Sequence, residues 1–145
     1  HSACFNHAFK HMPDLEINDI SEFLCKYVVP HLDIEKCDER VIVHKQCKIK
    51  SLNKSQYIED LARLCTDHVF NIKSFACDGF AGQKGFFTPE LNKSATKDLA
   101  SEIAEYGVTL GVSSSSTCEI GLGESGGIPF VGVAFLLDRC SKAKN

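Results

Sequence analysis

The side chains of this sequence that could perform chemistry are its cysteines, its histidines and one serine within a glycine-rich motif. Thiols form disulfides or bind soft metals, imidazoles bind metals or transfer protons, and a serine between glycines can act as a nucleophile. Each chemistry requires a particular spacing and a particular set of neighbouring elements. The spacing along the chain therefore decides which of them the sequence supports.

The eight cysteines are spread along all 145 residues, and no two of them are spaced as C-x-x-C. That spacing argues against a redox motif or a zinc knuckle. An even number at this density is typical of a disulfide framework in an oxidising compartment, and buried thiols in a cytosolic protein are the alternative. The sequence does not choose among the possible pairings. The expected disulfide-forming residues are Cys4, Cys25, Cys37, Cys47, Cys65, Cys77, Cys118 and Cys140.

Two glycosylation sequons and the first residues of the chain also favour secretion. Asn53 and Asn92 each begin an Asn-Lys-Ser triplet, although a helix is expected to begin near both and a helix cap is the alternative. The chain starts at His1 without a charged region followed by an apolar segment, so we expect any signal peptide to have been removed. The sequence predicts one secreted domain over residues 1–145.

Ser125 lies in Gly-Glu-Ser-Gly-Gly, which matches the G-x-S-x-G motif of nucleophilic serines. The motif also resembles the GDSGG segment of trypsin-like serine proteases, with glutamate in place of their aspartate. We expect a strand rather than a helix after Ser125, every histidine precedes it in the chain, and 145 residues cannot build the two barrels of that family. A small hydrolase would need His44 beside Ser125. The favoured interpretation is a glycine-rich turn, so we assign no catalytic residue.

The histidines near the start of the chain are candidates for metal ligands. His7 and His11 are four residues apart and would share one face of a helix, as zinc ligands do. The glutamate of a metalloprotease H-E-x-x-H motif is missing, because Ala8 follows His7. His1 resembles the N-terminal histidine of the copper-binding lytic polysaccharide monooxygenases, which are mainly β-sandwiches. Solvated surface histidines are the simpler interpretation, so we expect no metal site and no cofactor.

Hydrophobic periodicity predicts about three helices and several strands. The expected helices cover residues 17–29, 54–69 and 95–106. Alternating apolar and polar residues predict an outer strand over 40–50, and short strands are expected over 70–77 and 108–112. Residues 113–127 form an expected turn-rich stretch, followed by a central strand over 128–137 that is apolar on both faces. The predicted fold class is α+β, with about three helices packed on a mixed or antiparallel sheet and stapled by disulfides.

The composition is that of an ordinary globular domain, with 43% hydrophobic and 24% charged residues. Basic and acidic residues are interspersed around a net charge of -3, so no basic surface for nucleic acid is indicated. The longest strongly apolar run, 128–137, is shorter than the roughly 20 residues that a membrane helix needs, so we expect no membrane span. The oligomeric state is left open.

The irregular segment 78–93 is the expected binding site. Phe80, Phe86 and Phe87 lie there among glycines, and aromatic side chains on an adaptable loop are good anchors for a partner. The alternative is that these rings fold back over the sheet.

Between Gly85 and Cys140 the chain runs FFTPELNKSATKDLASEIAEYGVTLGV, then a polar turn, then GIPFVGVAFLLDRC. This layout resembles the small secreted proteins of parasitic and free-living clade V nematodes. The resemblance implies an excreted protein of the host–parasite interface that is not an established enzyme. It carries no functional residues over to this chain.

The function that these features predict is that of a secreted, non-enzymatic binding or effector protein that acts on an extracellular, possibly host, protein partner. An exposed aromatic patch would favour it. The first alternative is a carrier of a small apolar ligand, which a large internal apolar cavity would favour. The second alternative is a small secreted hydrolase that uses Ser125.

Overall fold

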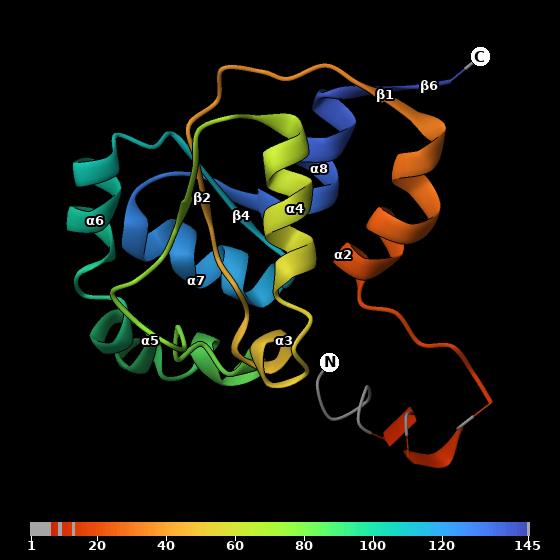
Figure 1. The fold of residues 1–145 in the computed structure, drawn as a ribbon. Coiled ribbons are helices and arrows are strands. Elements are labelled where there is room, and N and C mark those ends of the chain that lie inside the picture. Colours follow the sequence, from red (N-terminus) through yellow and green to blue (C-terminus); the bar gives the residue numbers. More distant parts are fainter. Residues whose placement is uncertain (1–6, 9, 13, 145) are drawn as a thin grey trace.

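The computed structural model describes residues 7–8, 10–12 and 14–144. A four-stranded sheet lies at its centre, with strand order β3-β2-β4-β5 and every neighbouring pair parallel (Figure 1). The strands are short: β2 Val41–Val43, β3 Val69–Asn71, β4 Leu110–Ser113 and β5 Phe130–Gly132. Parallel strands need long crossover connections, and helices supply them here.

Seven α-helices lie in the described part of the chain: α2 Ile20–Phe23, α3 Cys47–Ser51, α4 Gln56–Cys65, α5 Pro89–Ala95, α6 Leu99–Tyr106, α7 Ser116–Gly126 and α8 Val133–Arg139. Helix α2 continues into a π-turn, η1 Leu24–Val28, and a 3₁₀ turn, η2 Val29–His31. A further 3₁₀ segment, η3 Gly82–Phe86, precedes α5. Asp19 caps α2, since its Oδ1 accepts a hydrogen bond from the Ser21 amide at 2.9 Å.

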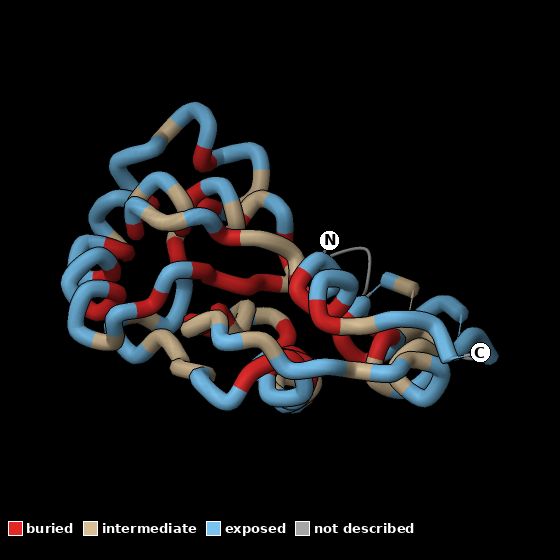
Figure 2. Tube along the Cα trace, turned by 90° about the horizontal axis from the view of Figure 1, so that it is seen from above, coloured by how far each residue is buried: buried red, intermediate tan, exposed pale blue. Residues whose placement is uncertain are grey.

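Helices cover both faces of the sheet, so the domain has three layers. On one face, Val41 and Val43 pack with Leu61 of α4 and Leu136 of α8. Ile42 points to the opposite face, where the residues that cover it belong mainly to α6 and α7: Leu99, Ile103, Cys118 and Leu122. The buried strands run between these outer layers in Figure 2. Successive side chains of β2 therefore point to opposite faces of the sheet and belong to two separate hydrophobic cores.

A second, two-stranded sheet pairs β1 Leu32–Ile34 with β6 Ser141–Ala143 in antiparallel register. This ribbon brings the chain after β1 next to the end of α8. The Sγ atoms of Cys37 and Cys140 lie 3.3 Å apart there.

The predicted α+β class is confirmed, because the chain combines helices with both parallel and antiparallel strand pairs. The expected number of helices is too low. The outer strand expected over 40–50 is wrong beyond Val43: β2 is buried on both faces, as a central parallel strand must be, and Cys47 begins α3. The apparent alternation after residue 43 belongs to a turn and a short helix.

The predictions for residues 113–137 also need correction. The stretch 113–127, expected to be rich in turns, contains helix α7. Close packing explains a glycine inside this helix, because a Cβ on Gly121 would lie 2.4 Å from the Phe80 ring. The expected central strand over 128–137 is only β5, and the apolar residues after it form α8. A short apolar run fits either element, and here the helix covers the sheet.

The expected disulfide staples are not seen. The seven cysteines among the described residues carry free thiols, and Cys4 lies outside these residues. None of the helices in this part of the chain has the length and apolar character that crossing a bilayer requires.

Candidate metal centre at the carboxyl ends of the strands

The strand order reverses between β2 and β4. From β2 the chain crosses to β3 on one side, and it then returns to β4 on the other side of β2. In open parallel sheets, ligands bind outside the carboxyl ends of the strands at such a switch point. His44 directly follows β2, and Ser113 is the last residue of β4, so both lie at this position.

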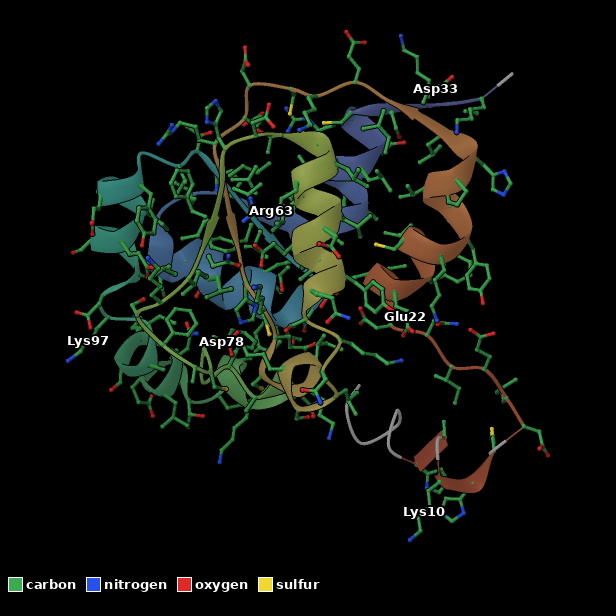
Figure 3. All side chains as sticks on the ribbon, in the orientation of Figure 1. Lys10, Glu22, Asp33, Arg63, Asp78 and Lys97 are labelled. Atoms are coloured by element: carbon green, nitrogen blue, oxygen red, sulfur yellow. The ribbon has the colours of Figure 1, made fainter. Side chains whose placement is uncertain are left out.

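A cavity of about 390 Å³ opens at this edge of the sheet. Figure 3 shows Asp78 at the same edge, in the neighbourhood of α3. The cavity is lined by side chains from the ends of β2 and β4, the start of α3, the loop after β3 and the first turn of α7. These residues are His44, Gln46, Cys47, Lys48, Cys77, Asp78, Ala81, Gly82, Ser115, Thr117 and Cys118.

Three different ligand groups converge in the floor of this cavity. A ring nitrogen of His44, a carboxylate oxygen of Asp78 and the Cys118 sulfur all lie within 4.8 Å of one another. The three residues are buried, with exposed fractions of 3%, 3% and 8%. They come from three separate parts of the sequence, so the parallel topology brings them together.

His44 is held rigidly at the end of β2. Its amide donates to the Val112 carbonyl at 2.9 Å, and its Nδ1 lies 3.1 Å from the Ser113 hydroxyl. Burial lowers the pKa of His44 to about 4, although the nearby Asp78 charge opposes this shift. The imidazole is therefore neutral at pH 7, which is the form that binds metals.

Asp78 is positioned by a tight turn that follows it. Its carbonyl accepts a hydrogen bond from Asn92 Nδ2 at 2.7 Å, and its Oδ1 accepts from the Phe80 amide at 3.2 Å. Gly79 has φ of +69°, and a Cβ there would lie 2.9 Å from the Leu91 carbonyl oxygen. Asp78 Oδ2 is buried and has no hydrogen-bond partner among the described residues.

Cys118 lies in the first turn of α7, close to the Ser115 cap. Burial raises the pKa of the Cys118 thiol to about 12, the Asp78 carboxylate acts in the same direction, and the Ser115 hydroxyl opposes them. A nucleophilic cysteine has a lowered pKa. This thiol is therefore poorly suited to act as a nucleophile on its own, whereas a bound metal would deprotonate it outright.

Cys47 and Cys77 line the same cavity but are exposed. The surrounding protein desolvates the Cys47 sulfur and raises the pKa of its thiol, and the nearby Cys77 thiol acts in the same direction. The two cysteines therefore lie near each other at the mouth of the cavity.

The structure does not bring Ser125 to His44. Ser125 is on α7 and its hydroxyl donates to Asn92 Oδ1 at 3.1 Å, whereas His44 is paired with Ser113. Asn92 is only 3% exposed and its Nδ2 is used by the Asp78 carbonyl, so the folded chain leaves no room for a glycan there. Asn53 is exposed and has φ of 54°, so it remains the accessible sequon.

The three expected binding phenylalanines separate into two groups. Phe80 is 3% exposed and packs edge-to-face against Phe86, with ring centroids 5.1 Å apart. The prediction that Phe80 is a surface anchor is therefore wrong, because its ring is buried against Gly85 and against Gly121 of α7. Phe86 and Phe87 are 58% and 79% exposed. The ring centroids of His7 and His11 lie 4.3 Å apart with the rings tilted by 34°, and both residues are exposed. His1 lies outside the described residues.

Sequence reasoning missed the set of His44, Asp78 and Cys118. One usable signal was present: His44 directly follows three consecutive β-branched residues, the pattern of a central parallel strand. Comparisons with protein-family models, with curated proteins and with solved structures gave no match. Function is therefore inferred from the geometry of this cavity.

Proposed function

We propose that the chain binds a zinc ion through His44, Asp78 and Cys118, and that the cavity offers the remaining coordination position to a small ligand. Nitrogen, oxygen and thiolate sulfur are all zinc ligands, with bonds of about 2.0 to 2.3 Å. Tetrahedral bonds of that length separate the ligand atoms by roughly 3.3 to 3.8 Å. The three atoms lie within 4.8 Å of one another, so small side-chain rotations suffice.

The observation that carries this proposal is the buried Asp78 carboxylate, which lies in one cluster with His44 and Cys118 and whose Oδ2 has no hydrogen-bond partner in the described part of the chain. A buried polar oxygen without a partner costs about 1 to 3 kcal/mol, and more if it is charged. A divalent cation offsets that cost, and it also favours the thiolate form of Cys118. A site for magnesium or calcium would instead be built from oxygen ligands alone.

Three protein ligands and an open position are typical of zinc sites that act on a bound molecule, whereas structural sites have four protein ligands. When bound, zinc would supply Lewis-acid activation of a water or carbonyl oxygen in the cavity. The chain's own residues would hold the ion, and the Ser113 hydroxyl would orient the His44 ring.

Zinc titration of the reduced chain against a chromophoric chelator tests the proposal. We expect one tight site per chain in the wild type and at least about a 100-fold loss of affinity in Asp78→Asn. Asp67→Asn is the matched control, because Asp67 is exposed and forms a surface ion pair with Lys36, and this variant should bind zinc as the wild type does. Equal zinc affinity in both variants would contradict the proposal.

A second candidate is the partner-binding function expected from the sequence, in a secreted, extracellular setting. It is supported by the exposure of Phe86 and Phe87, and by Leu91 of α5, which is 46% exposed on the helix that packs against η3. Exposed aromatic groups of this kind favour protein contacts. Cross-linking to host plasma proteins should fail in Phe86→Ser/Phe87→Ser, and unchanged cross-linking would count against this candidate.

The other two alternatives gain no support. The cavities of about 340 and 390 Å³ open to the surface and carry charged side chains, unlike an internal apolar cavity. The hydrolase alternative requires a hydrogen bond between Ser125 and a histidine. The Ser125 hydroxyl instead donates its hydrogen bond to Asn92.

A further inference from the structure

We propose that Cys47 and Cys77 form a redox-sensitive pair at the mouth of the cavity, and that a disulfide between them weakens zinc binding. This inference rests on the proposed zinc function. It assigns a modification site and a regulatory role to two residues that are not among the three zinc ligands.

The position of the pair connects it directly to the zinc ligands. Cys47 is the first residue of α3, three residues after His44, and Cys77 is the residue before Asp78. Both line the cavity, and the Cys77 thiol is near enough to raise the pKa of Cys47. A covalent bond between them would tie α3 to the loop that carries Asp78.

Accessibility separates this pair from the other cysteines. Among the seven cysteines of the described residues, Cys47 and Cys77 are the exposed ones, while the others are buried or half-buried. A bulky disulfide such as oxidised glutathione can therefore reach these two sulfurs most easily. Accessible and neighbouring thiols are the usual sites of reversible oxidation.

The oxidation proceeds by two thiol–disulfide exchanges. The Cys77 thiolate attacks a sulfur of glutathione disulfide first, because the raised pKa of Cys47 makes that thiol ionise less readily. This attack forms a mixed disulfide and releases one glutathione thiolate. The second thiolate attacks the chain's sulfur in that mixed disulfide, which closes the Cys47–Cys77 bond and releases the second glutathione. Two electrons pass to glutathione, and the two thiol protons end on the two released glutathiones.

Oxidation changes what the cavity offers to a metal. The reduced pair places two further thiols beside His44, Asp78 and Cys118, whereas disulfide sulfurs are poor ligands and carry no negative charge. The disulfide also restricts the rotation of Asp78 toward the ion. By linkage, a bound zinc ion must in turn disfavour the disulfide by the same factor.

Tryptic mapping can identify the bond without ambiguity, because cleavage after lysine and arginine places each cysteine on its own peptide. After equilibration with glutathione disulfide and thiol blocking, we expect peptide 46–48 linked to peptide 74–84. Added zinc should reduce the yield of this linked peptide. Absence of the linked peptide at every glutathione disulfide concentration would overturn the proposal.

Zinc affinity measured in both redox states completes the test. We expect the oxidised wild type to bind about tenfold more weakly or worse than the reduced form. The redox effect should vanish in Cys47→Ser/Cys77→Ser and persist in Cys140→Ser, which removes a thiol outside the cavity. Equal affinity in both redox states would overturn this inference alone, whereas no zinc binding in either state would overturn it together with the proposed zinc function.

Discussion

Two cavities of similar volume lie in different parts of the molecule and differ in chemistry. The carboxyl-edge cavity, about 390 Å³, contains His44, Asp78 and Cys118 at its floor. The second cavity, about 340 Å³, lies beside the β1–β6 ribbon and is lined by Cys37 and Cys140, with Cys65 behind them. We refer to these last three cysteines as the thiol cluster.

The two regions differ in the kinds of ligand atom that they contain and in whether those atoms already have a partner. The thiol cluster contains only sulfur, and the Cys37 and Cys140 sulfurs are already in contact at 3.3 Å. The carboxyl-edge cavity combines nitrogen, oxygen and sulfur, and it includes a buried carboxylate oxygen that has no hydrogen-bond partner in the part of the chain that the structure describes. Thiols that meet between a ribbon and a helix can stabilise the fold, whereas mixed ligands at a switch point indicate binding. We therefore expect oxidation to act mainly on stability in the first region and on zinc affinity in the second.

The largest expected effect is on the stability of the thiol cluster. A disulfide between Cys37 and Cys140 would join residues 103 positions apart, and loops of that size stabilise by about 4.7 kcal/mol in the chain-entropy model. Urea unfolding of the oxidised chain should show this gain, and Cys140→Ser should abolish it. A gain that persists in Cys140→Ser would place the stabilising bond elsewhere.

Zinc should stabilise the fold through the carboxyl-edge cavity alone. At a free zinc concentration 100 times the dissociation constant, mass action adds about 2.7 kcal/mol to the free energy of unfolding. Thermal unfolding with and without zinc measures this gain, and chelator should reverse it. The gain should be absent in Asp78→Asn and present in Cys140→Ser, and the opposite pattern would assign the metal to the thiol cluster.

Gly121→Ala should displace the residues that hold Asp78 in position. The new Cβ would lie 2.4 Å from the Phe80 ring and 2.8 Å from Asn92 Nδ2, and these two residues hold the Asp78 turn. Overpacking of this kind costs about 1 to 3 kcal/mol, and zinc affinity should fall with it. Gly123→Ala is the matched control on α7, because its nearest contact would be an ordinary 3.6 Å. Equal behaviour of the two variants in urea unfolding would refute this account of the packing.

The smallest expected effect concerns an ion pair next to the site. Lys45 and Arg63 lower the pKa of Glu59 to about 2. Because the folded pKa lies below the unfolded value of 4.5, the pair stabilises the fold fully above pH 4.5, and this contribution is lost as pH falls toward 2. Glu59→Gln should cost about 1 kcal/mol at pH 7 and almost nothing near pH 2. A difference between wild type and variant that does not change with pH would show that Glu59 acts by packing rather than by charge.

Local patterns predicted the helical segments better than the sheet. The periodicity of α4 and the Gly107 end of α6 were visible in the sequence, because they depend on residues a few positions apart. The sequence around β2 did not show that this strand is a central, parallel one. Its burial on both faces depends on α4 and α6, which follow later in the chain and cover the two faces. A strand of three residues is also too short for its hydrophobic pattern to be distinguished from that of a turn.

The site was hidden for the same reason. His44, Asp78 and Cys118 are each separated by more than 30 positions, and only the parallel order β3-β2-β4 places them at one edge. Cys118 looked like one member of a disulfide framework, and Asp78 looked like part of an aromatic loop. The Ser125 motif is contiguous and therefore easy to recognise in the sequence, yet its serine donates a hydrogen bond to Asn92.

The most direct test of the zinc site is the absorption spectrum of the chain with Co²⁺ in place of Zn²⁺. A thiolate bound to cobalt gives a sulfur-to-metal charge-transfer band, and tetrahedral coordination gives intense visible bands. We expect both in the wild type and in Cys140→Ser, with the charge-transfer band lost in Cys118→Ser and all bands lost in His44→Ala/Asp78→Asn. A charge-transfer band that survives in Cys118→Ser and disappears in Cys140→Ser would contradict the central claim.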